Sequence, residues 1–176
     1  MKKSFWLILS AFILMIGVLP AQALDGDRKG IVLNLGAGMG LADVSASDGT
    51  SLGLAGDFKI GSGLNSQILI YFTNRTLFFS QNDSGLTSGL SAVGASYFLK
   101  SEAPSFFVSG AFGEGRLIDS NVSGSKSGLG YTAGLGFEFA SNWIVEATYM
   151  NAKVDSGLDA DWTISNLVLS FSWLAY

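Results

Sequence analysis

The sequence contains no cysteine and no histidine among its 176 residues. Without cysteine there is no disulfide scaffold, no thiolate zinc site and no lipid anchor on cysteine. Without histidine the chain lacks the commonest general base and metal ligand, so Ser-His-Asp and Cys-His catalytic arrangements are excluded. We therefore predict no enzymatic activity, no catalytic residues, no cofactor and no metal site.

Charge and proline are also scarce. Charged residues make up 14% of the chain, hydrophobic residues 48%, and there are two prolines. The net charge is -4, which gives no support to nucleic-acid binding because that function requires a basic surface. The 23 glycines follow no collagen-like G-X-Y period. The composition therefore indicates a folded protein with too little charge for an ordinary soluble domain.

The amino-terminal segment has the pattern of an export signal. Lys2 and Lys3 precede an apolar run, Phe5–Leu19, which a proline and the small-residue sequence Ala21-Gln22-Ala23 follow. A membrane anchor is the alternative, but such a run spans only about 22 Å as a helix, and a bilayer core is about 30 Å thick. We therefore expect cleavage after Ala23.

The predicted domains are a signal peptide, residues 1–23, and a barrel domain, residues 24–176. In the second domain, large apolar residues alternate with small or polar ones, which is the period of a β-strand. No other apolar run in the chain is long enough for a membrane-spanning helix. The alternation predicts eight strands, at residues 31–41, 52–61, 67–75, 90–99, 106–113, 130–139, 143–150 and 166–173.

The two faces of these strands differ in a way that predicts the solvent of each. One face carries large apolar residues such as Phe58, Leu135 and Phe171, and no charge; the other is rich in glycine, alanine, serine and threonine. An eight-stranded barrel is too narrow to hold the large face, and glycine is a poor choice for a water-facing strand. We therefore predict an all-β fold, an eight-stranded antiparallel up-and-down transmembrane β-barrel with its bulky face toward lipid. The alternative is a soluble lipocalin-like barrel with the faces reversed.

The expected connections alternate between short and long, as in outer-membrane barrels, whose periplasmic turns are short and whose extracellular loops are long. This alternation predicts that both termini lie in the periplasm. The short connections are expected at residues 61–67, 100–105 and 140–142, and the long ones at 42–51, 76–89, 114–129 and 151–165.

Aromatic residues of the bulky face are expected near the strand ends, where they would form girdles at the two membrane interfaces. The periplasmic girdle would contain Tyr97, Phe106, Phe139, Trp143, Phe171 and Trp173, and the outer one Phe72, Phe112, Tyr131 and Tyr149.

By these features the chain resembles the small eight-stranded outer-membrane barrels, the outer-membrane protein A transmembrane-domain and opacity-protein-like group. The resemblance rests on the signal sequence, on the alternation at Ile31–Met39, Tyr131–Phe139 and Leu167–Trp173, and on the carboxyl-terminal aromatic residue Tyr176. It implies a bacterial outer-membrane location, with outer-membrane lipid and lipopolysaccharide as surroundings and the barrel-assembly machinery as a partner during insertion.

The final residue departs from the pattern of that family, whose last strand ends on an aromatic residue in register. Tyr176 has the opposite parity to Phe171 and Trp173. We expect either a bulge near Leu174-Ala175 or an exit of the last residues from the ladder.

Charged residues on the inward face are the main candidate site. Because buried charges must be paired, we expect a structural salt-bridge network, which Arg116 is also long enough to join. The alternative is a gate or narrow ion path; a glycosidase-like pair of carboxylates lacks any visible cleft. The predicted lumen residues are Asp57, Lys59, Arg75, Glu138 and Glu146.

The expected loops supply weaker candidates. Ser80–Gly85 and Ser120–Ser125 are polar, and Leu77–Phe79 is an apolar triplet that extends the barrel or contacts a partner. Asp155, Asp159 and Asp161 share one loop, but their spacing does not match a calcium-binding motif.

The sequence predicts a non-enzymatic outer-membrane barrel protein with a structural or surface-interaction role through extracellular loops. The alternatives are a narrow conduit for small or hydrophobic solutes and a secreted lipocalin-like ligand carrier.

Overall fold

The structure, a computed structural model, describes residues 27–45, 49–81, 84–120, 125–155 and 161–176. The predicted signal peptide lies outside the described residues. No helix in the described ranges is long and apolar enough to cross a membrane. The described chain forms eight strands: β1 (Gly30–Val44), β2 (Thr50–Gly63), β3 (Ile68–Gln81), β4 (Ser84–Phe98), β5 (Ser105–Asp119), β6 (Ser125–Ala140), β7 (Trp143–Val154) and β8 (Trp162–Ala175).

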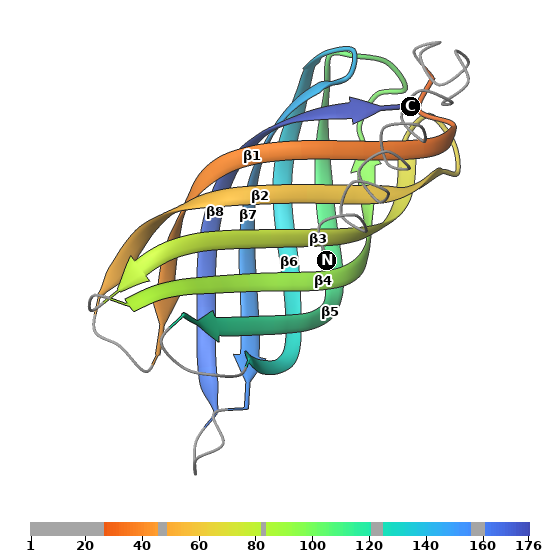
Figure 1. Ribbon diagram of the computed structural model, residues 1–176. Helices are drawn as coiled ribbons and strands as arrows, with labels where there is room; N and C mark the ends of the chain where they lie inside the picture. Colours follow the sequence, from red (N-terminus) through yellow and green to blue (C-terminus); the bar gives the residue numbers. More distant parts are fainter. Residues whose placement is uncertain (1–26, 46–48, 82–83, 121–124, 156–160) are drawn as a thin grey trace, which may run out of the picture.

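The strands form one closed antiparallel barrel (Figure 1). Each strand pairs with its neighbours in sequence, and β1 closes the barrel on β8. A row of paired residues that leaves β3 at Phe78 and passes once around the barrel returns to β3 at Ile68, ten residues away. This stagger tilts the strands, typically by about 35–45° to the axis in such barrels. The predicted eight-stranded up-and-down topology is confirmed.

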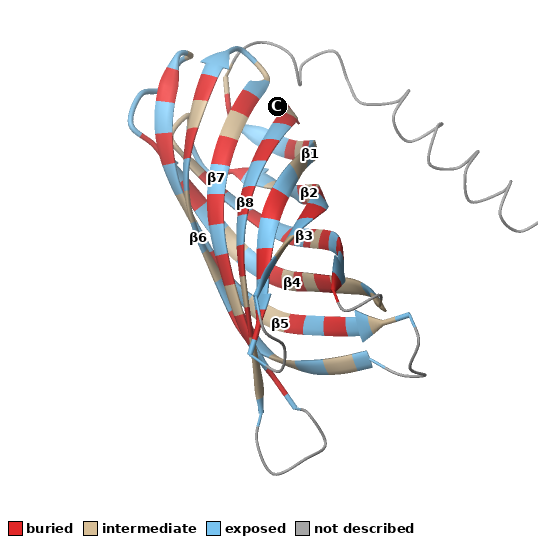
Figure 2. Cartoon of the chain, turned by 90° about the vertical axis from the view of Figure 1, so that its left-hand side faces the viewer, coloured by how far each residue is buried: buried red, intermediate tan, exposed pale blue. Residues whose placement is uncertain are grey.

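Burial alternates residue by residue along every strand, as the bands in Figure 2 show. Leu135 and Phe171 are 68% and 50% exposed on the outside, whereas Lys59 and Glu138 are buried in the lumen. The bulky face therefore points outward, as predicted, because an eight-stranded lumen is too narrow to hold all of the large side chains. The chain does not adopt the reversed arrangement of a soluble lipocalin-like carrier.

The strands extend well beyond the predicted segments at one end of the barrel. We call the end where β1 begins and β8 finishes the terminal end, and the opposite end the far end. The predicted long connection 76–89 is mostly strand, because β3 runs to Gln81 and β4 starts at Ser84. The other three long connections are shortened in the same way. The expected difference in loop length between the two ends was wrong; the far end instead carries an extension of the barrel wall.

The inward face of these extensions is apolar, which explains why the alternation in the sequence did not predict them as strands. Near the terminal end the outward residues are large and apolar. In the far-end extension the inward residues, including Leu77 and Phe79, are apolar and buried. The outward residues are mixed: Glu114 and Arg116 on β5 are charged, whereas Phe78 on β3 is apolar and exposed. Such strands do not continue the alternation of large outward and small inward residues.

The lumen is filled, and not only by the small polar groups that the alternation suggested. Apolar side chains also point inward, where they pack in three clusters. From the terminal end to the far end these include Tyr71, Phe98 and Phe107, then Leu90 and Met150, then Leu77, Phe79, Val154 and Ile164.

One seam of the barrel opens before its strands end. The pairing of β2 with β3 stops at Gly53 and Phe79, although β2 begins at Thr50 and β3 continues to Gln81. The outer parts of β2 and β3 keep their other partners, β1 and β4, respectively. The β1–β2 and β3–β4 hairpins therefore diverge at the far end.

Candidate functional site

Four of the five predicted lumen charges meet in one cluster at mid-barrel, which we call the ion cluster: Asp57, Lys59, Arg75 and Glu146. The Lys59 Nζ donates to Glu146 Oε2 at 2.7 Å, and Arg75 Nη2 lies 2.7 Å from Asp57 Oδ2 and 2.9 Å from Glu146 Oε2. Lys59 Nζ is also 3.6 Å from Asp57 Oδ2. Two cations and two anions make the cluster neutral.

Strand geometry places these groups together. Asp57 and Lys59 lie two residues apart on β2, so both point into the lumen, and Asp57 pairs directly with Arg75 on β3. Glu146 reaches the cluster from β7 across the barrel. Ser109 on β5 donates a hydrogen bond to Glu146 Oε1 at 2.5 Å. The cluster therefore cross-links four strands through the interior.

Burial decides what the ion cluster can do. All four charged residues are at most 5% exposed, so each depends on its partners for solvation. The two cavities that flank Lys59 and Tyr71 have volumes of about 10 Å³ each, room for about one water molecule. The cluster acts as a packed plug across the lumen at this level.

Glu138, the fifth predicted lumen charge, does not join this cluster. It is fully buried nearer the terminal end, where Arg28 Nε donates to Glu138 Oε2 at 2.8 Å and Arg28 Nη2 also contacts that oxygen. Arg116, which we expected to reach the lumen carboxylates, instead faces outward and pairs with Glu114. Arg116 lies on the outward parity of β5, so its side chain cannot turn inward without inverting the strand.

Arg28 closes the terminal end of the barrel. Its Nη1 donates to the carbonyl oxygens of Ser66, Lys100 and Ser101 at 2.9, 2.9 and 3.0 Å. These oxygens belong to the β2–β3 and β4–β5 connections, and Glu138 lies next to the β6–β7 turn. The fully buried guanidinium therefore ties together all three connections at this end, a role invisible in the sequence because Arg28 precedes the first alternating segment.

Tyr176 completes this terminal cap, the group formed by Arg28, Glu138 and Tyr176. β8 ends at Ala175, so the last residue leaves the ladder, which decides between the two expected explanations of its parity. The ring is 1% exposed, and its hydroxyl donates to Glu138 Oε1 at 2.7 Å. Burial, and the hydrogen bond to the carboxylate, raise the pKa of Tyr176 to about 12.

Asn142 fastens the chain end to the neighbouring turn. It occupies the two-residue β6–β7 turn with φ of 73°, a left-handed conformation that asparagine tolerates. Its backbone N–H donates to Glu138 Oε1 at 3.2 Å, and its side-chain amide donates to the Leu174 carbonyl at 2.7 Å. The cap therefore connects the last strand to the wall by side chains as well as by the ladder.

The remaining candidates do not assemble into a site. Asp161 pairs with Lys153 at 3.2 Å, Asp155 is exposed, and Asp159 lies outside the described residues. The described residues contain no group of three metal-binding side chains. Ser80 and Ser125 belong to strands, while the middle of each predicted polar loop lies outside the described residues.

The ten predicted girdle residues all project outward, but their positions along the strands differ from expectation. Six of them lie near the terminal ends of their strands, namely Tyr97, Phe106, Phe139, Trp143, Phe171 and Trp173. Trp143 stacks on Phe171 with the ring centroids 5.1 Å apart. The other four are in the middle of strands and not at the far ends, because the strands continue past them; they are Phe72, Phe112, Tyr131 and Tyr149.

Comparisons with known proteins support the fold. The crystal structure of Ail, the attachment invasion locus protein of Yersinia pestis, is 20% identical, with a TM-score of 0.56 over 83% of this chain and 99% of that one. Ail in complex with the heparin analogue sucrose octasulfate gives 18% identity and the same TM-score over 82% and 99% of the two chains.

Neisserial surface protein A is 15% identical, with a TM-score of 0.57 over 82% of this chain and 96% of that one. Neither the protein-family models nor the curated protein sequences contain a match. The chain shares its fold, though little of its sequence, with the small eight-stranded outer-membrane barrels.

Proposed function

We propose that this protein resides in a bacterial outer membrane with both termini in the periplasm, and that it acts without catalysis through its far-end surface. The observation that carries the proposal is the outward apolar face around a lumen plugged at several levels. A plugged barrel leaves the outer surface and the far-end extension as the parts that can meet other molecules.

Catalysis finds no support in the buried carboxylates. Glu146 is held by Lys59, Arg75 and Ser109, and Glu138 by Arg28 and Tyr176. The two belong to separate, fully packed groups and face no cleft that would admit a substrate. Their roles are structural.

Charge at the far end bears on the kind of partner. Ail was crystallised with a sulfated sugar, which is a polyanion. The far end of this barrel is acidic, which disfavours polyanions and favours neutral or cationic partners. The described charges there are Asp43, Glu114, Asp119, Asp155 and Asp161 against Arg116, Lys126 and Lys153.

Labelling of intact cells tests orientation and location. Because the chain has no cysteine, Ser45→Cys at the far end and Ser101→Cys at the terminal end each supply a unique thiol at an exposed position. A membrane-impermeant maleimide should label Ser45→Cys on whole cells and Ser101→Cys only after lysis. The reverse pattern would contradict the proposed orientation, and recovery of both variants in the soluble fraction would contradict the location.

Binding to two probes tests the partner chemistry. The barrel in neutral phosphatidylcholine vesicles should bind polylysine, with affinity falling as salt rises, and should not retain sucrose octasulfate. Retention of the sulfated sugar would contradict the proposed charge preference.

A conduit for hydrophobic solutes is the second candidate, favoured by the diverging β2–β3 seam beside the apolar far-end cluster. An aqueous path through the axis is opposed by the ion cluster and the terminal cap. Faster entry of a fluorescent hydrophobic probe into cells that carry the barrel than into cells that lack it would favour the conduit over the surface role.

A further inference from the structure

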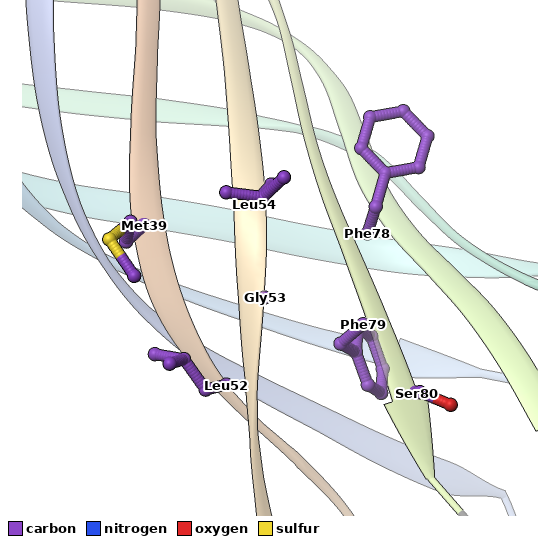
Figure 3. Close-up of a pocket in the computed structure, with 7 residues that line it drawn as sticks. All are labelled: Met39, Leu52, Gly53, Leu54, Phe78, Phe79 and Ser80. Atoms are coloured by element: carbon purple, nitrogen blue, oxygen red, sulfur yellow. The ribbon is translucent and has the colours of Figure 1, made fainter. Parts of the chain in front are cut away.

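A groove on the outer surface lies where β2 and β3 diverge, with a volume of about 400 Å³ (Figure 3). This volume is within the range of protein pockets for small ligands. Figure 3 shows β2 and β3 separating beyond Gly53 and Phe79, the last pair of their ladder.

The groove cuts into the barrel wall and does not merely follow its surface. Its sides are outward-facing Leu52, Leu54 and Phe78, which are 62%, 65% and 55% exposed. Its floor includes Phe79, an inward-facing residue that also packs in the apolar far-end cluster. Gly53 permits this arrangement, because a Cβ there would lie 2.4 Å from the Phe78 carbonyl oxygen.

The surroundings of the groove indicate what fills it. Met39 lines the groove and pairs across the barrel seam with Leu169, which is 59% exposed, so the groove is continuous with the lipid-facing surface. Ser80 gives the lining a polar limit toward the far end. An apolar trough open toward the hydrocarbon, with a hydroxyl at its outer limit, matches an acyl chain that ends in a polar headgroup.

The β2–β3 fork, where the two strands diverge beyond Gly53 and Phe79, is a poor site for an added peptide strand. The unpaired parts comprise three residues of β2 and two of β3, too short for a stable extra ladder. Gln81 Nε2 also donates to the Gly49 carbonyl at 3.0 Å and so bridges the fork at its outer end. The groove remains open sideways, toward the membrane.

We propose that this groove binds one acyl chain of a membrane phospholipid, held against Leu52, Leu54 and Phe78. The inference rests on the proposed membrane location. It assigns a lipid site to the β2–β3 fork, where the wall itself opens, and to no other part of the apolar surface.

Native mass spectrometry of barrels released from phosphatidylethanolamine vesicles into mild detergent tests the proposal. The unmodified protein should retain one phospholipid. Leu52→Trp fills the groove and should reduce the lipid-bound fraction by about tenfold, the effect of losing one apolar contact surface. Leu129→Trp, at an equally exposed leucine on β6, should retain lipid like the unmodified protein.

Phe78→Ala, which removes one wall of the groove, should also reduce retention and serves as a second test if Leu52→Trp does not fold. Folding of each variant is checked by heat-dependent gel mobility. Equal retention in Leu52→Trp and Leu129→Trp, or no lipid on the unmodified protein, would overturn the proposal. A dimer or a bound polypeptide that Leu52→Trp abolishes would overturn it in favour of another occupant.

Vesicle flotation separates this failure from failure of the membrane location. If the protein floats with vesicles but shows no groove-dependent lipid, the membrane location stands and the lipid site is contradicted. If the protein does not float, both proposals are contradicted.

Discussion

At the scale of single residues, buried charges stabilise the interior of the barrel. Removal of a buried charge should lower the free energy of unfolding far more than removal of an exposed one. Glu146 accepts hydrogen bonds from Lys59, Arg75 and Ser109, and both of the charged donors are at most 5% exposed. Removal of one partner leaves the others buried without full compensation. The ion cluster should therefore reveal itself in stability and not in transport.

We expect Glu146→Gln to lower the free energy of unfolding by about 3 kcal/mol, because it leaves two buried cations to share one carboxylate. Glu114→Gln, which breaks an exposed pair with Arg116, should change it by less than about 1 kcal/mol. Urea unfolding in detergent micelles measures both. Unchanged stability of Glu146→Gln together with an altered single-channel current would contradict the structural role and show that the ion cluster gates an ion path.

The terminal cap should show strong coupling between its partners. Arg28→Met and Glu138→Leu should each destabilise by about 3 kcal/mol, whereas the double variant should lose much less than the sum, since no buried charge is left alone. A double-mutant cycle from unfolding midpoints measures the coupling. Additive losses would show that Arg28 does not act through Glu138.

Tyr176 gives the cap a distinct pH dependence. Its pKa in the folded protein is raised to about 12 from an ordinary value of 10, so the folded state binds the proton more tightly than the unfolded state. This contribution to stability is complete below about pH 10 and is lost as the pH rises through about 12.

Absorbance titration of the phenolates should show one more late-ionising tyrosine in the unmodified protein than in Tyr176→Phe, and the stability difference between the two proteins should shrink above pH 10. Identical titrations of the two proteins would contradict burial of Tyr176 against Glu138.

At the scale of strands, the far-end extension shows what periodicity can and cannot predict. The eight predicted segments were predictable in register, even the fourth segment, because on each strand the residues of one face are larger than those of the other. The extensions were missed because their inward face is apolar and their outward face is mixed: Leu77 is buried inside, while Phe78 and Arg116 are exposed outside. Arg28 was missed because it lies on no strand, and the correct grouping of Glu138 required knowledge of its height in the barrel.

Because the inward face of the extension is buried and the outward face is exposed, substitutions of an inward and an outward leucine should differ in their effect on stability. Leu77→Ala should destabilise the barrel by about 3 kcal/mol, because it leaves a cavity in the buried far-end cluster. Leu129→Ala, at a position that is 68% exposed on the outer surface, should cost less than about 1 kcal/mol. Unfolding midpoints compare the two, and equal effects would mean that the extension is not a packed part of the barrel.

At the scale of the whole molecule, hydrocarbon must surround the bulky face for the location, the plugged lumen and the lipid groove to be consistent. Closed pairing from β1 to β8 satisfies the backbone without water, which a membrane requires. The acidic far end and the tied connections of the terminal end then lie on opposite sides of the apolar band. In this account the lumen is closed, and the far end is the part of the barrel that binds other molecules.

Spin labels on single cysteines test this arrangement most directly. In phospholipid vesicles, a label at Leu135→Cys should collide mainly with oxygen, which concentrates in hydrocarbon, whereas a label at Ser127→Cys in the far-end extension should collide mainly with a water-soluble nickel chelate. If the nickel chelate relaxes the Leu135→Cys label as strongly as the Ser127→Cys label, water surrounds the bulky face and the protein is not a membrane barrel.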